Sequence, residues 1–530
     1  MVVQAVLLIA FFALMIGIGL YCRRHATDVN GFVLGGRSVG PWLTAFAYGT
    51  SYFSAVIFIG YAGQFGWSFG LASTWIGLGN AVIGSLMAWN ILGRRTRIMT
   101  QHLDSRTMPD FFSKRFDSRA LKIAASVIVF VFLIPYTASL YNGLSSLFDM
   151  AFGLPYWVCI VVMAALTAVY VIFGGYMATA INDFVQGLIM LFGICVVIGA
   201  VVKSNGGLLE AIRSLSLIES PYADTLGTKG AFISFFGTQL LYLLFVVLLT
   251  SLGTWGLPQM VGKFYSIKSE ADIKKGTIIS TFFAIIVAGG CYFLGGFGRL
   301  YDSVIAKTET GAVISFDSIV PAMLSTLPSI VIAIVVVLVL SASMSTLSSL
   351  VLTSSSTLTL DVILPLRKKR VSEKDTVKTM RIFIVFFIVV SAVIAILKDR
   401  FNFSMIAQMM GVSWGALAGA FLAPFLYGLY WKGTTKASVA VCFIYGAGLM
   451  IVQMLKSMGV LTIQGGFLGF VFTNSLYSGV FAMVGGLILV PIISLITPRM
   501  NRADVDSMFV CYDTLVQVPA SRSLGEEAKR

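Results

Sequence analysis

The sequence predicts an all-α integral membrane protein of about 13 transmembrane helices, and three observations carry this prediction. Of the 530 residues, 58% are apolar and only 11% are charged, against roughly 25% charged residues in soluble domains. The apolar residues are gathered into blocks of about 20, the length at which an α-helix crosses a hydrocarbon core. The basic residues lie between these blocks, where they fix topology in a lipid bilayer. The net charge of +14 therefore indicates orientation, and no nucleic-acid partner is expected.

A window of about 19 residues places the spans. They are expected near 2–22, 41–63, 72–93, 121–147, 155–174, 182–202, 231–254, 277–297, 328–357, 382–397, 404–430, 437–455 and 470–497. The first block has no basic residue before it and Arg23 and Arg24 after it, the reverse of a secretory signal. It is therefore expected to be a retained helix.

The distribution of basic residues predicts the topology. With the N-terminus outside, 29 of the 37 Lys and Arg residues fall on the cytoplasmic side and 8 outside, with cytoplasmic clusters at 94–97 and 367–370. This asymmetry favours a multi-pass protein of the plasma membrane, most simply a bacterial cytoplasmic membrane, with the C-terminus cytoplasmic. An outside loop at 203–229 contains a short amphipathic stretch that is expected on the surface. The polar tail after Pro498 is expected to be mobile.

Motifs of other functional classes are missing from the sequence. The six cysteines show no paired spacing, so neither disulfides nor a metal site is expected. There is no nucleophile elbow and no Walker loop. The chain is therefore not expected to be an enzyme or an ATP-driven pump, and no cofactor is expected beyond a coupling ion.

Two predicted spans carry residues that interrupt helices. The second contains Gly-Thr-Ser-Tyr-Phe-Ser at 49–54, and the seventh, five spans later, contains Thr-Ser-Leu-Gly-Thr-Trp-Gly-Leu-Pro at 250–258. Matching breaks in two repeats mark the binding sites of many transporters, because unwound backbone can coordinate ions. The pair predicts inverted repeats of spans 2–6 and 7–11. The alternative is that these small residues only serve helix contacts.

The ninth span is rich in hydroxyls between 341 and 349. On a helix the carbonyl of Ala342 lies beside the hydroxyls of Ser345 and Thr346, and three neutral oxygens suit a small hard cation. The alternative is that these hydroxyls bond back to their own helix. A proton relay lacks its parts, because both histidines, His25 and His102, lie in predicted loops and no chain of buried carboxylates crosses the membrane.

Asp183 is the one acidic residue tucked against a predicted span, at the cytoplasmic start of the sixth helix. It could guide a cation in or out of the protein. The alternative is an ordinary acidic residue at a helix N-terminus, where the helix dipole favours it.

Four stretches together resemble the sodium:solute symporter family. They are Gly35-Gly36-Arg37-Ser38, the segment from Gly174-Gly175 to Asp183 and Gln186, the segment Ala342 to Thr346, and Gly428-Leu429-Tyr430-Trp431-Lys432. The resemblance implies a leucine-transporter-like fold of two inverted five-helix repeats. It also implies a sodium site made by carbonyls of the broken helix and by the hydroxyl-rich helix, which correspond here to Thr50, Phe53, Ala342, Ser345 and Thr346. Asp183 would lie on the sodium path.

The chain departs from the sodium/proline carriers that it resembles. They have an Asp where this chain has Tyr52, and they have Trp and Tyr where this chain has Thr250 and Thr254. Other runs are more similar to the sodium/pantothenate branch, which favours a small carboxylate-bearing solute. Polar or aromatic residues near the breaks are candidates for its pocket: Tyr52, Ser54, Gln239, Thr254 and Trp255.

These observations predict sodium-coupled import of a small organic solute by alternating access. The segments expected are a first helix and loop (1–40), repeat 1 (41–202), an outside loop with repeat 2 (203–430), two further spans (431–497) and a tail (498–530). A solute sensor that does not transport and a channel remain alternatives. The short tail without a signalling domain and the lack of a repeated pore filter weigh against them.

Overall fold

The computed structural model is a bundle of long helices, and it describes residues 2–23, 26–153, 155–221, 229–309, 311, 313–367, 371–397 and 406–513. Within these ranges nine helices are long and apolar enough to cross a membrane, or ten if one bent pair forms a single span. Two isolated bridges, Val39 to Ile267 and Lys307 to Val313, are the β pairing that the described residues contain. The predicted helical membrane class is confirmed.

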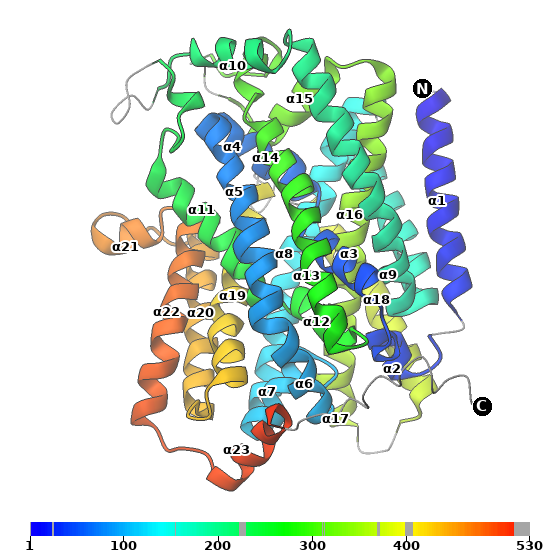
Figure 1. Cartoon of the computed structure of the whole chain (residues 1–530), viewed down its shortest axis with the longest axis vertical. Helices are drawn as coiled ribbons and strands as arrows, with labels where there is room; N and C mark the ends of the chain where they lie inside the picture. The colour runs from blue at the N-terminus through cyan, green and yellow to red at the C-terminus, as the bar shows by residue number, and fades with distance from the viewer. Residues whose placement is uncertain are drawn as a thin grey trace, which may run out of the picture.

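The helices run mostly along the long axis of the molecule (Figure 1). In the first half of the chain they are α1 (Val2–Cys22), α2 (Val29–Leu34), α3 (Pro41–Tyr52), α4 (Ala62–Phe69), α5 (Thr74–Gly79), α6 (Arg94–His102), α7 (Met108–Phe116), α8 (Arg119–Phe152), α9 (Tyr156–Ser204) and α10 (Leu208–Ser216). Turns of π-helix, η3 (Val56–Tyr61), η5 (Asn80–Met87) and η6 (Trp89–Gly93), join several of these into longer rods.

The second half of the chain continues the bundle. Its helices are α11 (Leu240–Leu252), α12 (Pro258–Ser266), α13 (Glu270–Ala284), α14 (Gly290–Gly295), α15 (Ile319–Ser325), α16 (Ser329–Thr357), α17 (Leu364–Leu366), α18 (Glu373–Ile396), α19 (Ile406–Tyr430), α20 (Lys436–Ser457), α21 (Gly466–Val471), α22 (Ser475–Ile496) and α23 (Arg502–Phe509). Short turns include η8 (Gly253–Gly256), η12 (Leu358–Ile363) and η14 (Val510–Tyr512).

The described residues contain nine or ten candidate spans, where the sequence predicts thirteen. One element in that count, α9, consists of two helices that meet at a kink at Gly175 (φ 55°, ψ −149°), and these two helices match the predicted spans 155–174 and 182–202. An added Cβ at Gly175 would lie 3.0 Å from the Phe32 carbonyl oxygen, so this bend brings α9 close to α2. The amphipathic stretch of the outside loop forms α10, which buries Ala211 and Leu215 and exposes Leu209.

Capping residues decide where several helices begin. Ser269 accepts a hydrogen bond from the backbone N–H of Asp272 at the start of α13, and Ser372 accepts one from Asp375 at the start of α18. Such N-caps satisfy amide groups that have no partner within the helix. They lie at one end of the bundle together with the acidic residues that follow them, and these acidic residues also suit the helix dipole.

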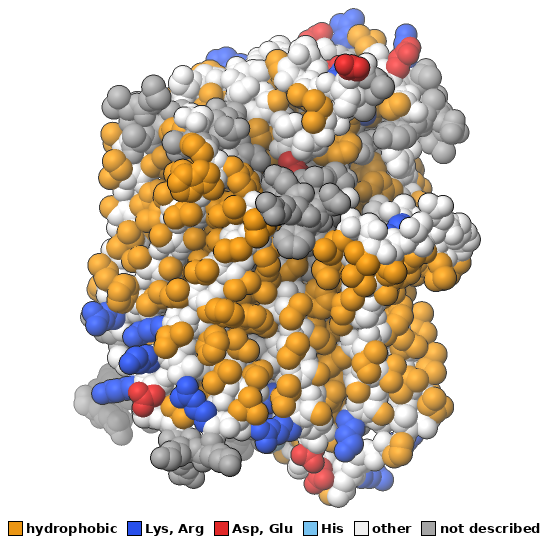
Figure 2. All heavy atoms as spheres, turned by 180° about the vertical axis from the view of Figure 1, so that it is seen from behind, with side chains coloured by type: hydrophobic (Ala, Val, Ile, Leu, Met, Phe, Trp, Pro, Cys, Tyr) orange, Lys and Arg blue, Asp and Glu red, His pale blue; other side chains and the backbone are white. Residues whose placement is uncertain are grey.

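The outer surface divides into an apolar belt and polar ends. Figure 2 shows hydrophobic side chains over the middle of the bundle, with Lys and Arg side chains gathered at the end that carries α6, α7 and α23. We call this end the basic end. Exposed residues of the belt include Phe192, Ile278, Phe282 and Ile444. Such a belt is what a bilayer requires of a spanning bundle.

A buried ionic network anchors α16 at the basic end. The Lys122 ammonium lies 2.7 Å from Asp110 Oδ1 and 3.1 Å from Asp361 Oδ1. The Thr107 hydroxyl donates to Asp361 at 2.6 Å. Burial raises the pKa of Asp110, but the ammonium groups of Lys122 and Lys114 outweigh it and hold that pKa below its usual range. The network joins α7 and α8 to η12, directly after α16.

The first part of the C-terminal tail contacts the bundle, so the expectation of a mobile tail is wrong for the described residues up to 513. The Arg115 guanidinium lies 5.0 Å from the centre of the Phe509 ring and donates from Nε to the Gly428 carbonyl at 2.9 Å. Lys432 pairs with Asp506 at 2.7 Å. Burial lowers the pKa of Arg115 to about 10, so the side chain remains a cation near neutral pH.

Arg95 makes a similar contact with the tail. Its guanidinium lies between the rings of Tyr430 and Tyr512, 4.0 and 4.5 Å from their centres, and donates to the Leu429 carbonyl at 3.1 Å. Cation–π contacts of this kind stabilise buried or half-buried arginines. The segment 428–432, singled out in the sequence, is therefore where the tail, α6 and α7 meet the end of α19.

Candidate sodium and solute sites

The chain unwinds between α3 and η3. Phe53 is extended (φ −92°, ψ 105°), and the next helix is capped by Ser54, whose hydroxyl accepts from the Val56 N–H at 3.2 Å. The Ser54 carbonyl accepts from both Ile57 and Phe58 at 3.0 Å. The last carbonyls of α3 lose their helical donors at such an end. The predicted break in the second span is therefore present, and its backbone oxygens are free to bind other groups.

The hydroxyls of α16 meet these oxygens. The Thr346 hydroxyl lies 2.9 Å from the Thr50 carbonyl, 3.4 Å from that of Phe53 and 3.1 Å from that of Ala342. The Ser345 hydroxyl lies 3.3 Å from the Thr50 carbonyl and 3.1 Å from that of Ala342. All five residues are buried. The structure thus brings the five residues predicted to bind sodium into one cluster, which we call the oxygen cluster.

The chemistry of the oxygen cluster suits a small monovalent cation. Its donors are three carbonyls and two hydroxyls, which are hard neutral ligands. Among the described residues no group of three or more His, Cys, Asp or Glu side chains could hold a metal ion. The alternative, that these hydroxyls only bond back to α16, does not hold, because both also reach across to α3.

Asp183 does not lie at a helix N-terminus. It is eight residues past the bend at Gly175, inside α9, and its side chain is fully buried. Its carboxylate pairs with Lys263, with Nζ 3.7 Å from Oδ2. Lys263 in turn donates to the Ser349 hydroxyl at 3.0 Å, one turn of α16 from Ser345. The interpretation of Asp183 as an ordinary acidic residue of a first helical turn is therefore wrong.

Three further residues, Lys263, Ser349 and Ser51, lie beside the oxygen cluster and are not among the site residues predicted from the sequence. Lys263 falls between the predicted spans 231–254 and 277–297, whereas α12 carries it into the protein with 3% of its surface exposed. The sequence signal for this placement is Pro258, which begins α12 five residues before Lys263, since proline is common in the first turn of a helix. The Ser51 hydroxyl lies 2.9 Å from that of Ser349, next to Thr50 in the chain.

The second break lies between α11 and α12, which are bent by 47°. Thr254 donates to the Ser251 carbonyl at 2.8 Å, and its hydroxyl is 3.5 Å from the Gly84 carbonyl. Trp255 Nε1 donates to the Ile83 carbonyl at 3.0 Å. Both predicted pocket residues are buried and contact the neighbouring helix η5. Their polar atoms are satisfied by protein groups.

The two breaks share one neighbour. The Gly84 carbonyl of η5 accepts from the Tyr48 hydroxyl of α3 at 2.7 Å and lies beside Thr254 of η8. Of the other predicted pocket residues, Ser54 is buried at the first break. The side chain of Tyr52 lies outside the described residues, although its backbone ends α3.

Gln239 does not join the predicted pocket. The expected span from 231 begins nine residues later, because the chain turns at Gly237 (φ 70°) and α11 starts after Gln239. The thirteen residues of α11 separate Gln239 from the break at Gly253, about 20 Å at 1.5 Å per residue. At that distance Gln239 does not lie beside the break, so its assignment to a pocket there is wrong.

Broken spanning helices whose freed carbonyls meet hydroxyls of a facing helix are the construction of secondary active transporters. Comparison with known proteins gives the family. The sodium:solute symporter family model matches residues 32–446, and the chain belongs to this family. It is therefore a sodium-coupled symporter of a small organic solute and a multi-pass membrane protein.

Two relatives illustrate the similarity. The osmoregulated proline transporter OpuE of Bacillus subtilis is 29% identical over 503 residues, which cover 93% of this chain and 94% of the relative. A sodium/proline symporter of Staphylococcus aureus is 30% identical over 460 residues, 84% and 85% of the two chains. Both are named as proline transporters.

A solved structure gives the same fold. The substrate-bound, outward-open state of a Na+-coupled sialic acid symporter superposes with a TM-score of 0.72 at 16% sequence identity. The match covers 94% of this chain and 99% of that one. The bundle described above is therefore the fold of that symporter.

Proposed function

We propose that this symporter uses the oxygen cluster to bind sodium and imports a small carboxylate-bearing solute such as an amino acid or a pantothenate-like acid. The observation that carries the sodium site is the position of the Thr346 hydroxyl, within 3.4 Å of the carbonyls of Thr50, Phe53 and Ala342. Sodium bound there would hold the broken α3 against α16. The proposal includes no cofactor and no enzymatic step.

The solute is proposed to bind at the midplane beside the two breaks. Ser54, Thr254 and Trp255 are the described candidates for this pocket, with Tyr52 as a fourth from its position in the chain. The relatives named as proline transporters make proline the first solute to test. Thr250 and Thr254 stand where the proline carriers have aromatic residues, which is why other small carboxylates belong in the same test.

The proposed cycle is alternating access between two inverted repeats. Breaks in α3 and α11, five predicted spans apart, support repeats of spans 2–6 and 7–11 within thirteen spans, as does the likeness of folds. We propose that the basic end faces the cytoplasm and that the N-terminus lies outside, because Lys and Arg gather at that end (Figure 2). Sodium and solute would bind from the opposite end.

Linkage sets the energetics of the cycle. If bound sodium orders the breaks and so tightens solute binding, the solute must raise sodium affinity by the same factor, and such couplings are typically about 1 to 3 kcal/mol. The membrane potential adds about 2.3 kcal/mol per charge for each 100 mV. The sodium concentration gradient and the membrane potential together would drive accumulation of the solute without a nucleotide.

Uptake into liposomes tests the proposal. The purified protein is reconstituted, an inward sodium gradient is imposed, and uptake of labelled proline, pantothenate and short carboxylates is measured with potassium replacing sodium as the control. Accumulation of one solute above its outside concentration, only with the gradient, supports the proposal. Sodium-dependent binding without uptake would favour a sensor, and uptake that never exceeds equilibration would favour a channel.

A further inference from the structure

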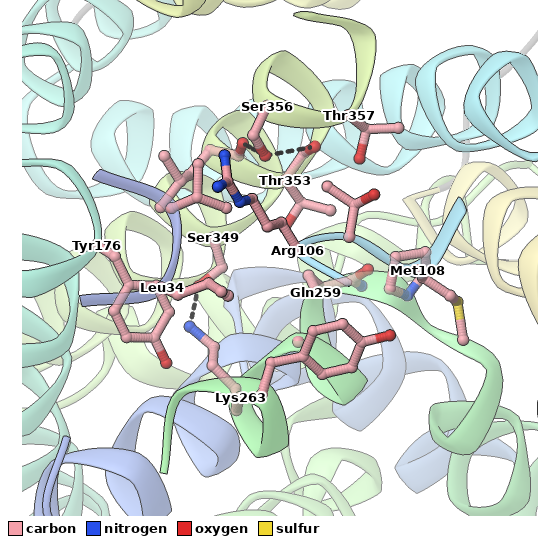
Figure 3. Close-up of a pocket in the computed structure, with 16 residues that line it drawn as sticks. Leu34, Arg106, Met108, Tyr176, Gln259, Lys263, Ser349, Thr353, Ser356 and Thr357 are labelled. Atoms are coloured by element: carbon pink, nitrogen blue, oxygen red, sulfur yellow. Dashed lines mark hydrogen bonds between the residues drawn. The ribbon is translucent and has the colours of Figure 1, made fainter. Parts of the chain in front are cut away.

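A buried ammonium group lies directly beside the oxygen cluster. Lys263 of α12 points to Ser349 of α16 (Figure 3), with Nζ 3.0 Å from the serine hydroxyl, 3.7 Å from Asp183 Oδ2 and 5.2 Å from the centre of the Tyr176 ring. Lys263 and Asp183 expose 3% and 0% of their surface. Burying one charge alone would cost far more than burying the pair. Each group therefore needs the other in this structure.

The ammonium contacts α16, one of the two helices that form the oxygen cluster, through Ser349. Ser349 follows Ser345 by one turn of α16, so both side chains lie on one face of that helix. Its hydroxyl also contacts Ser51, the residue after Thr50 in α3. The Lys263 ammonium is thus one helical turn from the oxygen cluster, toward the basic end.

A small polar cavity lies beyond this ammonium. It has a volume of about 50 Å³, enough for a few water molecules, and is lined by Arg106, Tyr176, Gln259, Lys263, Ser349 and Ser356 among others. Neither polar atom of the buried Gln259 amide has a hydrogen-bond partner among the described residues. Water in this cavity would satisfy it. Lys263 therefore stands between the oxygen cluster and a wet space on the side of the basic end.

The Lys263 ammonium balances the charge of the Asp183 carboxylate, so no unpaired negative charge remains there to bind a second cation. A carboxylate buried in a membrane protein needs a cation, and sodium is the cation that this carrier brings in. We infer that Lys263 is a tethered cation that determines stoichiometry: its ammonium occupies the position in which Asp183 and Ser349 would otherwise hold a second sodium. The carrier therefore couples one sodium to each solute. This inference rests on the proposed sodium site and adds a residue that sets the ion ratio.

Replacing the ammonium by an apolar side chain of similar length should open this second position. In Lys263→Met, Asp183 keeps its charge and Ser349 its hydroxyl, so a second sodium binds and moves with the solute. In the double variant Lys263→Met with Asp183→Asn, both charges are gone and the ratio returns to one. Lys263→Arg retains a cation and keeps the ratio at one.

The experiment measures the accumulation limit in liposomes clamped at zero membrane potential, with the solute found in the uptake panel. If one sodium ion moves with each solute molecule, a tenfold sodium gradient sustains at most about tenfold accumulation of the solute. If two move, the limit is about a hundredfold, because each sodium ion contributes the same free energy. We expect about tenfold for the native protein, Lys263→Arg and the double variant, and a limit approaching a hundredfold for Lys263→Met.

Several results would overturn the inference without touching the proposed function. A limit near a hundredfold for the native protein would do so, as would a limit near tenfold for an active Lys263→Met variant. If that variant does not fold, binding of radioactive sodium to the native protein decides, because two bound sodium ions per chain contradict a tethered cation and one supports it. If Lys263→Met lowers the affinity for the solute but leaves the number of sodium ions per solute molecule unchanged, Lys263 is a solute ligand instead. Absence of sodium-driven uptake by the native protein would refute the proposed function itself.

Discussion

The two helix breaks are built from similar residues but use them differently. At the first break, the carbonyls of α3 and the hydroxyls of α16 face one another, and no charged side chain belongs to the cluster. At the second break, Thr254 and Trp255 are bonded to protein carbonyls, and the charged residue Lys263 follows within α12. The neutral oxygens of the first break can therefore exchange their contacts with one another for contacts with an ion. The polar groups of Thr254 and Trp255 at the second break are bonded to protein and would have to release those bonds to contact a solute.

This difference teaches that a break in a helix is not by itself a binding site. Unwound backbone becomes a ligand only where a facing helix supplies further oxygens, as Ser345 and Thr346 do. Where the facing surface is backbone at van der Waals distance, the same kind of break is a joint between helices. An added Cβ at Gly256 would lie 2.9 Å from both the Ala418 Cα and the Leu422 backbone nitrogen of α19.

The largest expected effect comes from removing one hydroxyl at the first break. Thr346→Ala should raise the sodium concentration for half-maximal uptake by about 10- to 150-fold, because a contact to a charged partner contributes about 1.5 to 3 kcal/mol. The sodium dependence of initial uptake rates measures this. Ser343→Ala is the matched control, since among the described residues the Ser343 hydroxyl bonds only back to Val339 in the same helix. An unchanged sodium dependence in Thr346→Ala would refute the site.

At the second break, we expect the stability of the protein to fall when a side chain is enlarged. Gly256→Ala forces backbone atoms of η8 and α19 apart and should destabilise the protein by about 1 to 3 kcal/mol. Thermal unfolding in detergent measures the loss. Gly253→Ala is the control, because its Cβ would meet side chains of Ala418 and Leu249 only at 3.6 Å. Equal melting temperatures for the two variants would show that η8 is not a tightly packed joint.

A hydroxyl at the second break should affect the solute more than the ion. Thr254→Val removes a hydrogen bond of about 1 kcal/mol next to the proposed pocket, so the KM for the solute should change about fivefold. The sodium concentration for half-maximal uptake should stay within about twofold at saturating solute. Thr254→Ser keeps the hydroxyl and should resemble the native protein. A large shift in sodium dependence alone would place Thr254 with the ion and not with the solute.

The smallest effect is expected at Ser51, whose contact with Ser349 connects the first break to Lys263 of α12. Ser51→Ala removes the contact between α3 and Ser349 but leaves Lys263 bonded to Ser349, so sodium affinity should fall by about threefold to fivefold. Uptake at varied sodium measures it. An effect as large as that of Thr346→Ala would mean that Ser51 itself binds the ion.

The sequence could predict the oxygen cluster because its parts are local. Helical periodicity places Ala342, Ser345 and Thr346 on one face, and the run at 49–54 contains residues that interrupt a helix. The sequence does not predict where Gln239 and Lys263 lie, because each is close to a point at which a helix begins. There, a turn at Gly237 and a helix starting at Pro258 decide whether a polar side chain faces solvent or the interior, and hydropathy averaged over about 19 residues does not resolve such turns.

The number of spans was harder to predict than their positions. A kink at a single glycine, Gly175, joins two helices within α9 with no loop between them, and π-helical turns such as η5 keep successive segments continuous. The contacts of the tail with the bundle are not predictable from the sequence for another reason. Its apolar residues are few, and Phe509 and Tyr512 are stabilised by arginines of distant segments, which composition alone cannot reveal.

The docked tail has a practical consequence for handling this protein. An affinity tag or fluorescent reporter joined after Asp513 leaves the rings of Phe509 and Tyr512 on their arginines. One joined after Arg499 would delete both rings, the partner of Lys432, and the residue whose backbone carbonyl contacts His102. The guanidinium groups of Arg95 and Arg115 would then each lose one aromatic contact. Shortened forms made for crystallisation or for library screening should therefore keep the chain through residue 513.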